Sequence, residues 1–498
     1  MTSMHLTRSA GILLHPTSLP GPYGIGDIGL AAHQWLDDLA ASGCKLWQVL
    51  PLCPTGYADS PYQCFSTFAG NVYVISPDDL LAEGLVTADD LADHPDFPQD
   101  QVDYGPVISW KLKLLDTALD RFQGGSFPEL RAEFEKFRIS NHEWLDDFAL
   151  FMAIKDLYNL KPWTEWPAPL RDRDTLQLQK ARAAYAGEVT RHAFRQFLFF
   201  RQWKALRTHA QETGVMIVGD LPIFVAHDSA DVWAKRDLFH LDEMGKPSVV
   251  AGVPPDYFSK TGQLWGNPLY RWDVHGERGY AWWLARFRAA FKLVDVVRVD
   301  HFRGFVDYWE IPGTATTAIE GRWLPGPGAR FLQAVTDELG ELPIIAEDLG
   351  EINPDVFVLR DEFDLPGMKI LQFAFDDGLD NEFLPHHYPT NCIVYTGTHD
   401  NDTTLGWWES ATEEERAFAT EYLGVTGEDI SWDLIRAAWK SKANVAIAPL
   451  QDVLSLPTSA RMNFPGTLGG NWRWRMPAGA FTPQLRAKVA ELNRDTFR

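Results

Sequence analysis

The stretch CIVYTGT, residues 392–398, is a short run of apolar and β-forming residues that leads directly into His399 and Asp400. Seven other runs of this kind occur along the chain: Gly11–His15, Leu46–Leu52, Val215–Leu221, Val294–His301, Pro343–Glu347, Lys369–Phe375 and Asn444–Leu450. Most are continuously apolar rather than alternating, which is typical of strands buried on both faces of a parallel sheet. The pattern therefore predicts eight buried parallel strands.

Segments with the apolar spacing of helices separate many of these runs. They cover Ile28–Ser42, Tyr280–Phe291, Ala329–Leu339, Pro354–Phe363, Glu413–Leu423 and Asp433–Lys440. Alternation of helices with eight strands predicts an α/β protein with a (β/α)8 TIM barrel. A doubly wound open sheet is the alternative, and the number of strands favours the closed barrel.

The longest gap between predicted strands runs from residue 53 to residue 214. Only Asn71–Ile75 has an extended pattern there, whereas Trp110–Phe122, Glu129–Phe137, Trp144–Asn159 and Glu188–Thr208 have helical patterns. We predict a single catalytic barrel over residues 1–498 that carries a mostly helical inserted subdomain over residues 77–213. Residues 227–273 are rich in Pro, Gly and aromatic residues, which predicts an irregular active-site insert.

Charge and hydropathy exclude several classes of partner. The formal net charge is −23, so the surface repels nucleic acid and anionic membranes, and we expect neither as a partner. No apolar run reaches the roughly 18 residues of a membrane span, and Met1–Ala10 lacks an apolar signal core. The four cysteines form no C-x-x-C pair. These features predict a cytoplasmic protein, which we expect to be a monomer.

The chain holds 20 tryptophans among 498 residues. Such an excess is compatible with a densely packed aromatic core. It is equally compatible with exposed aromatic platforms for a flat, neutral ligand such as a sugar ring. Composition leaves both interpretations open.

Four predicted strands end in a carboxylate. These residues are Asp220, Asp300, Glu347 and Asp400. The C-terminal ends of barrel strands face the active site, and a buried ionised carboxylate is costly unless it is paired or functional. Clustered carboxylates of this kind predict glycoside cleavage, in which one attacks the anomeric carbon and a protonated second one assists the leaving oxygen. Arg298 shares a strand face with Asp300 and would keep it ionised.

Several longer strings are specific to one family. They are HPTSLPGPYG (15–24), DSPYQ (59–63), VPPDYF (253–258), WGNPLY (265–270), GTHDND (397–402) and RMNFPG (461–466). With these strings the chain resembles the 4-α-glucanotransferases of glycoside hydrolase family 77, also called amylomaltases or disproportionating enzymes, in the α-amylase superfamily. The matching strings span nearly the whole chain.

The resemblance implies a role for each carboxylate at the predicted strand ends. Asp300 matches the family's nucleophile, Glu347 its general acid/base and Asp400 its transition-state stabiliser. Asp220, Arg298 and His399 match residues that bind the sugar at the bond being cut.

The resemblance also implies a set of substrate-binding residues around these carboxylates. Tyr257 and Phe258 would lie on a loop over the active site, next to Trp265. The donor cleft would be lined by Ser60, Tyr62, Asp377 and Asn463. Tyr57 and Tyr104 match a second glucan-binding groove away from the catalytic centre.

The implied activity is transfer of α-1,4-glucan segments between maltooligosaccharides or starch-type glucans. It would be a retaining double displacement through a covalent glycosyl-enzyme, with cyclisation of long glucans as a further outcome, and would need no cofactor or metal. The main alternative is an α-glucan hydrolase with the same residues. A non-catalytic sugar-binding protein would lack the carboxylates. A dinucleotide-binding enzyme is suggested only by GIGDIG (24–29), which a proline-rich segment separates from the preceding strand.

Overall fold

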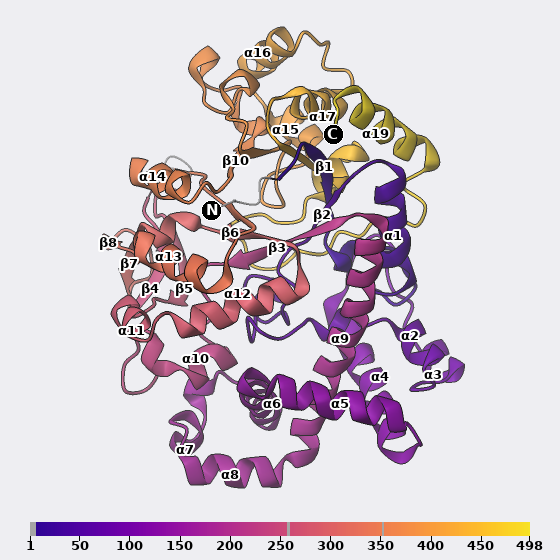
Figure 1. The fold of residues 1–498 in the computed structure, drawn as a ribbon, viewed down its shortest axis with the longest axis vertical. Helices are drawn as coiled ribbons and strands as arrows, with labels where there is room; N and C mark the ends of the chain where they lie inside the picture. The colour runs from indigo at the N-terminus through magenta and orange to yellow at the C-terminus, as the bar shows by residue number, and fades with distance from the viewer. Residues whose placement is uncertain (1–5, 256–258, 351–352) are drawn as a thin grey trace.

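The centre of the molecule is an eight-stranded parallel sheet (Figure 1). The computed structural model describes residues 6–255, 259–350 and 353–498. The strands are β1 Ser9–Leu13, β2 Leu46–Gln48, β3 Met216–Pro222, β6 Val296–Asp300, β9 Ile344–Ala346, β10 Gly367–Ile370, β11 Cys392–Tyr395 and β12 Val445–Pro449. Each overlaps one of the eight predicted runs, so the prediction of buried parallel strands is confirmed.

The order of the strands identifies a barrel. Neighbours run β10-β11-β12-β1-β2-β3-β6-β9, so the last strand along the chain pairs with the first. The two ends of this order also meet, because the Ala346 amide donates a hydrogen bond of 2.9 Å to the Pro366 carbonyl between β9 and β10. The (β/α)8 prediction is therefore confirmed and the open-sheet alternative is wrong.

Apolar side chains fill the barrel interior. Every strand contributes to it: Leu13, Leu46, Val218, Val296, Ile345, Met368, Ile393 and Val445 lie in one buried cluster. Such a packed lumen leaves the C-terminal rim of the strands as the place where polar side chains can gather.

Helices surround this barrel where the sequence predicts them. They include α1 Leu30–Ala41, α12 Ala281–Leu293, α13 Gly328–Leu339, α14 Pro354–Glu362, α16 Glu413–Leu423 and α17 Ile430–Lys440. A further helix, α19 Pro483–Asp495, is not among the predicted ones. Local chemistry sets the ends of α16: Thr412 and Glu415 form a reciprocal capping box, and Gly424 ends the helix at φ 66°. Shorter helices are α2 Pro77–Ala82, α3 Ala88–Ala92, α10 Ala230–Ala234, α11 Trp272–Glu277, α15 Thr404–Ser410 and α18 Leu450–Val453.

A group of helices extends from one side of the barrel, at the bottom of Figure 1. It comprises α4 Tyr104–Gly124, α5 Pro128–Ser140, α6 His142–Leu157, α7 Ala168–Arg171, α8 Thr175–Ala184 and α9 Ala186–Thr213. The long helix α9 contacts both this group of helices and the helices around the barrel. Its Arg195 pairs with Asp116 of α4 at 2.7 Å, whereas its Trp203 donates to the Leu293 carbonyl at the end of α12.

Two local predictions differ from the structure. Asn71–Ile75 is not extended, because the Asn71 side chain accepts the Tyr73 amide and caps a one-turn 3-10 helix, Val72–Val74. Residues 227–273 are also not irregular throughout, since they contain β4 Val249–Val253 and β5 Gln263–Pro268.

These two strands join a second, antiparallel sheet of order β5-β4-β7-β8, with β7 Asp307–Pro312 and β8 Arg322–Pro325. The pairing is non-local, with Val250 opposite Ile311, which a local pattern does not reveal. Among the described residues, no helix is long and apolar enough to cross a membrane.

Candidate active site

Three adjacent strands bring the predicted carboxylates to one rim of the barrel. In the register of β3 and β6, Asp220 lies opposite Arg298. In the register of β6 and β9, Val299 lies opposite Ala346, so that Asp300 and Glu347 follow on neighbouring strands. Residues 47 positions or more apart in sequence therefore meet because consecutive barrel strands pair in register.

Arg298 lies between two of the carboxylates. Its Nη1 is 2.7 Å from Asp220 Oδ2 and 3.1 Å from Asp300 Oδ1. The Asp220 side chain is fully buried, and this burial raises its pKa to about 6 although Arg298 acts in the opposite direction. The same carboxylates raise the pKa of Arg298, so the guanidinium remains a fixed positive charge. Arg298 thus orients Asp300 and places a positive charge beside it.

Glu347 has a different environment. Its Oε2 accepts the His301 amide at 2.7 Å and its Oε1 accepts the Leu349 amide at 3.1 Å. Burial raises the pKa of Glu347 to about 7, and the charge of Asp300 acts in the same direction while Arg298 and the amides oppose it. A carboxyl group with this pKa exchanges a proton near neutral pH, as a general acid/base requires.

A tyrosine joins this group to the end of β11. The Tyr62 hydroxyl donates to Asp220 Oδ2 at 2.9 Å and also lies 2.9 Å from His399 Nε2. The rings of Tyr62 and His399 stack with their centres 5.3 Å apart. His399 Nε2 is in turn 3.4 Å from Asp400 Oδ1. The polar groups therefore form one continuous network around the rim.

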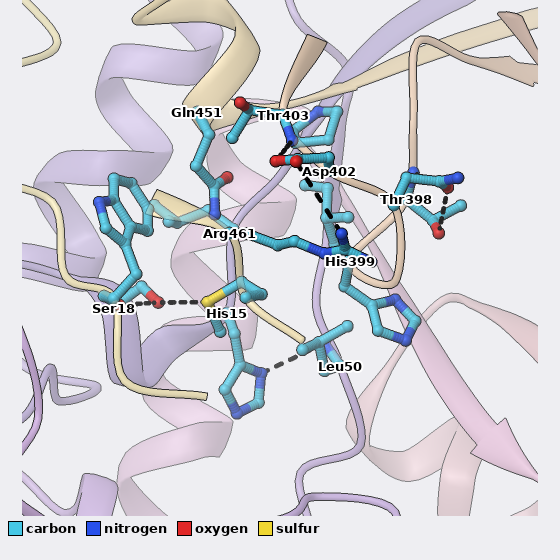
Figure 2. Close-up of a pocket in the computed structure, with 15 residues that line it drawn as sticks. His15, Ser18, Leu50, Thr398, His399, Asp402, Thr403, Gln451 and Arg461 are labelled. Atoms are coloured by element: carbon cyan, nitrogen blue, oxygen red, sulfur yellow. Dashed lines mark hydrogen bonds and ion pairs between the residues drawn. The ribbon is translucent and has the colours of Figure 1, made fainter. Parts of the chain in front are cut away.

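Asp400 is positioned from the far end of the chain. Asn463 Nδ2 donates to Asp400 Oδ1 at 2.6 Å, and Arg461 donates to the Asp400 carbonyl at 2.6 Å and to the Asn463 carbonyl at 2.7 Å. Figure 2 shows the Arg461 side chain reaching toward Asp402, 3.9 Å away. Arg461 was not among the predicted site residues, although it opens the RMNFPG string.

A small cavity lies behind this part of the rim (Figure 2). Its volume is about 20 Å³, and His15, His399, Gln451 and Arg461 are among its lining residues. Burial lowers the pKa of His15 to about 3, so this imidazole is neutral. A cavity of this size admits a water molecule but no sugar ring, so a ligand of that size does not fit here.

The structure also places three further residues of the predicted cleft, Ser60, Trp265 and Asp377. Ser60 Oγ accepts the Tyr62 amide at 3.2 Å and so shapes the loop that carries Tyr62. Trp265, on β5, packs edge to face on His301 at 4.9 Å, close to the backbone that holds Glu347. Asp377 is exposed just before the turn Gly378–Asp380 that follows β10.

The predicted second groove receives less support. Tyr104 is only 6% exposed and its hydroxyl donates to the Trp472 carbonyl, so its ring is part of the core rather than a sugar platform. Tyr57 begins the 3-10 helix Tyr57–Asp59. Tyr257 and Phe258 lie outside the described residues. In the part of the chain that is described, no group of three or more His, Cys, Asp or Glu side chains is arranged to hold a metal ion.

Comparison with known proteins extends the resemblance to the whole chain. A family model described as 4-alpha-glucanotransferase, of glycoside hydrolase family 77, matches residues 14–481. A 4-alpha-glucanotransferase of Thermus thermophilus is 52% identical over 99% of this chain and 100% of its own length. One of Synechocystis is 49% identical over 94% of each chain. The solved structure of an amylomaltase from Streptococcus agalactiae in complex with acarbose has a TM-score of 0.96 at 39% identity, covering 99% of both chains.

Proposed function

The chain belongs to the 4-alpha-glucanotransferase family, glycoside hydrolase family 77, and from this premise we propose how its own residues carry out the reaction. The protein is a 4-α-glucanotransferase that acts on α-1,4-glucans and maltooligosaccharides by a retaining double displacement. The relatives named above are transferases, which favours transfer over the hydrolase alternative. The roles of individual residues are the proposal.

In the first step Asp300 attacks the anomeric carbon of the donor glucan. The 4-hydroxyl oxygen of the departing segment takes the proton of Glu347, and the other segment remains bound to Asp300 through an ester. The observation that carries this assignment is the contrast between the two side chains: Asp300 lies beside the Arg298 guanidinium, whereas the pKa of Glu347 is raised to about 7. Neighbouring strands are about 4.8 Å apart, which suits the short carboxylate separation of a retaining enzyme, about 5–5.5 Å.

In the second step Glu347, now ionised, takes a proton from the 4-hydroxyl of an acceptor sugar. That oxygen attacks the anomeric carbon and displaces Asp300, which restores the α configuration. Asp400, which lies 3.4 Å from His399 in the same network, would stabilise the positive charge on the ring in both transition states. Its side chain is held for this by Asn463.

The polar network would bind the sugar at the bond being cut. Asp220 Oδ1 is buried and accepts a hydrogen bond from none of the described residues, and we propose that it turns to a sugar hydroxyl when the glucan binds. Tyr62 and His399 supply a stacked pair of rings beside it. The structural relative from S. agalactiae holds acarbose, and we expect this pseudo-oligosaccharide to occupy the same rim here.

Incubation with maltotriose tests the function. Transfer predicts glucose together with longer maltodextrins, while the total number of reducing ends stays constant. A rising number of reducing ends would mean hydrolysis and would contradict the proposal.

The pH dependence of the reaction follows from the raised pKa of Glu347. Glu347 must be protonated when the donor binds, and its pKa is about 7 rather than the ordinary 4.5. We therefore expect kcat/KM for maltotriose to fall as pH rises through about 7, approaching tenfold per pH unit well above it. The measurement is glucose release over about pH 5–9. A decline centred near pH 5 would show that Glu347 titrates like an exposed carboxyl.

The Tyr62→Phe variant tests the network around Asp220. It removes the hydroxyl that bonds to Asp220 and His399 but keeps the stacked ring. Hydrogen bonds to charged groups contribute about 1.5–3 kcal/mol, so we expect kcat/KM for maltotriose to fall about tenfold or more. Tyr388→Phe is the control, because the Tyr388 hydroxyl donates to the Phe383 carbonyl, outside the network around Asp220. Equal activity of the two variants would contradict a binding role for Tyr62.

Further parts of the proposal concern the surroundings of the site. Trp265 would cover the bound glucan and exclude water, which favours an acceptor sugar. Ser60 and Asp377 would contact the donor chain. We also propose that the enzyme can cyclise long glucans and works as a cytoplasmic monomer, in keeping with its acidic composition.

A further inference from the structure

A second cavity, which we name the seam cleft, lies between the helical insert and the outer side of the barrel. Its volume is about 620 Å³, within the 300–1,000 Å³ typical of small-molecule sites. The walls come from the end of α5, the start of α6, α10 and α12, helices that lie close together in Figure 1. None of the four rim carboxylates lines it.

Aromatic rings stand on both walls of the seam cleft. On the insert side Trp144 and Phe200 lie with ring centres 5.8 Å apart, and on the barrel side Phe68 and Trp282 lie 6.0 Å apart. All four are partly exposed, so the core does not fully explain them. Opposed aromatic walls with a wet opening suit a ligand that has apolar faces and polar edges.

The charge on the walls is balanced. Lys235, Arg278, Arg288 and Lys292 are the basic lining residues, and Glu143, Asp147 and Asp231 are the acidic ones. Arg278 is paired with Asp237 at 2.5 Å and Arg288 is paired with Glu338. Because the arginines are engaged in ion pairs, the cleft offers no concentrated positive charge. A neutral, polyhydroxylated ligand fits this lining better than an anion.

One loop connects the seam cleft to the active site. Tyr62 belongs to the catalytic rim, whereas Ser66 and Phe68 line the cleft. Ser66 is four residues from Tyr62, so their Cα atoms are at most about 14 Å apart. The Ala230 amide of α10 donates to the Phe65 carbonyl at 2.8 Å and fixes this loop to the cleft wall. This loop therefore runs from the catalytic rim to the wall of the seam cleft.

We propose that the seam cleft binds a stretch of α-1,4-glucan at a distance from the bond being cut. The proposal rests on the transferase activity assigned above, which supplies the polymer. A long glucan held at two places gains an intramolecular second contact and so binds more tightly than either contact alone allows. Maltotriose is too short to occupy both places, so the seam cleft does not increase its affinity.

Two variants of the seam cleft test the proposal. Trp144→Ala removes an aromatic face, and Ala285→Trp fills the cleft from α12 without removing any packing side chain. Ala183→Trp, at an exposed alanine of α8, is the matched control. We expect both cleft variants to raise KM for amylose about three- to tenfold, the value of one aromatic contact. Their kcat/KM for maltotriose should stay within about twofold of the wild-type and control values.

Binding without turnover gives a second measurement. In the Asp300→Asn background, adding Ala285→Trp should weaken retardation in starch-containing native gels by the same factor, while adding Ala183→Trp should not. An unchanged amylose KM and unchanged retardation in the cleft variants would overturn the proposal, as would a parallel loss with maltotriose. Failure of the wild-type enzyme to convert maltotriose would instead overturn the function, and the gels would still report on the cleft.

Discussion

The Asp300→Asn enzyme is expected to lose glucan transfer by about 10⁴-fold or more in kcat, the scale seen when a catalytic nucleophile is removed. Asparagine keeps the shape of the side chain and can still accept a hydrogen bond from Arg298, which lies 3.1 Å from Asp300 Oδ1. The neutral amide, however, cannot form the ester intermediate. The measurement is the initial rate of glucose release from maltotriose, followed for long enough to detect one turnover per day.

The control for this variant is a carboxylate on the same side of the barrel. Asp355 is exposed in the first turn of α14, which follows β9, and Asp355→Asn should keep its rate within about twofold of wild type. Thermal unfolding of both variants shows whether the fold is intact. If Asp300→Asn retained a tenth of the wild-type rate or more, another group would have to be the nucleophile.

The Glu347→Gln enzyme is expected to lose about 10²- to 10⁴-fold in the rate with maltotriose, the contribution of a general acid/base. The departing 4-hydroxyl is a poor leaving group unless it receives the proton that the raised pKa of Glu347 provides. With maltotriosyl fluoride as donor, the leaving fluoride needs no such proton. The first step should therefore lose far less than the complete reaction.

Parallel measurements with the two donors separate this role from a structural one. The glutamine oxygen can accept only one of the His301 and Leu349 amides that now bond to the two carboxylate oxygens, so thermal unfolding of the variant must accompany these rates. Equal losses with maltotriose and with the fluoride would mean that Glu347 acts by positioning or charge rather than by proton transfer.

The barrel strands were predictable because burial on both faces requires a continuous run of apolar residues. Residues 392–395 and 445–449 are almost wholly apolar, and each forms a barrel strand. The second sheet has no such local pattern, since β4 is stabilised by pairing with β7, more than 50 residues away. Asn71 shows the other kind of failure, in which a side-chain cap overrides an extended pattern.

The carboxylates of the site were predictable because a barrel places strand ends on one rim. The bonds between them were not: Tyr62 meets Asp220 across 158 positions, and Arg461 meets Asp400 across 61. Nothing local in the sequence identifies Arg461 as the residue that fixes the backbone of Asp400. Tyr104 illustrates the opposite case. Its residue type matches the family's second groove, but its side chain is buried.

The excess of tryptophan is now largely explained by packing. Seven of these side chains are among the largest fully buried ones: Trp35, Trp47, Trp163, Trp203, Trp233, Trp283 and Trp439. The indole of Trp47, for example, donates to the Leu14 carbonyl inside the fold. Trp144, Trp265 and Trp282 are partly exposed and are the rings that we propose contact the sugar. Composition could not separate the two groups, because burial is decided by tertiary contacts.

The most direct test of the mechanism is to trap the glycosyl-enzyme. Glu347→Gln should react with maltotriosyl fluoride and then persist, because no base activates the acceptor for the second step. Mass spectrometry of the intact protein should show one maltotriosyl group added, and peptide mapping should place it on Asp300. No adduct, or an adduct on Asp220 or Asp400 instead, would contradict the assignment of Asp300 as nucleophile and Glu347 as acid/base.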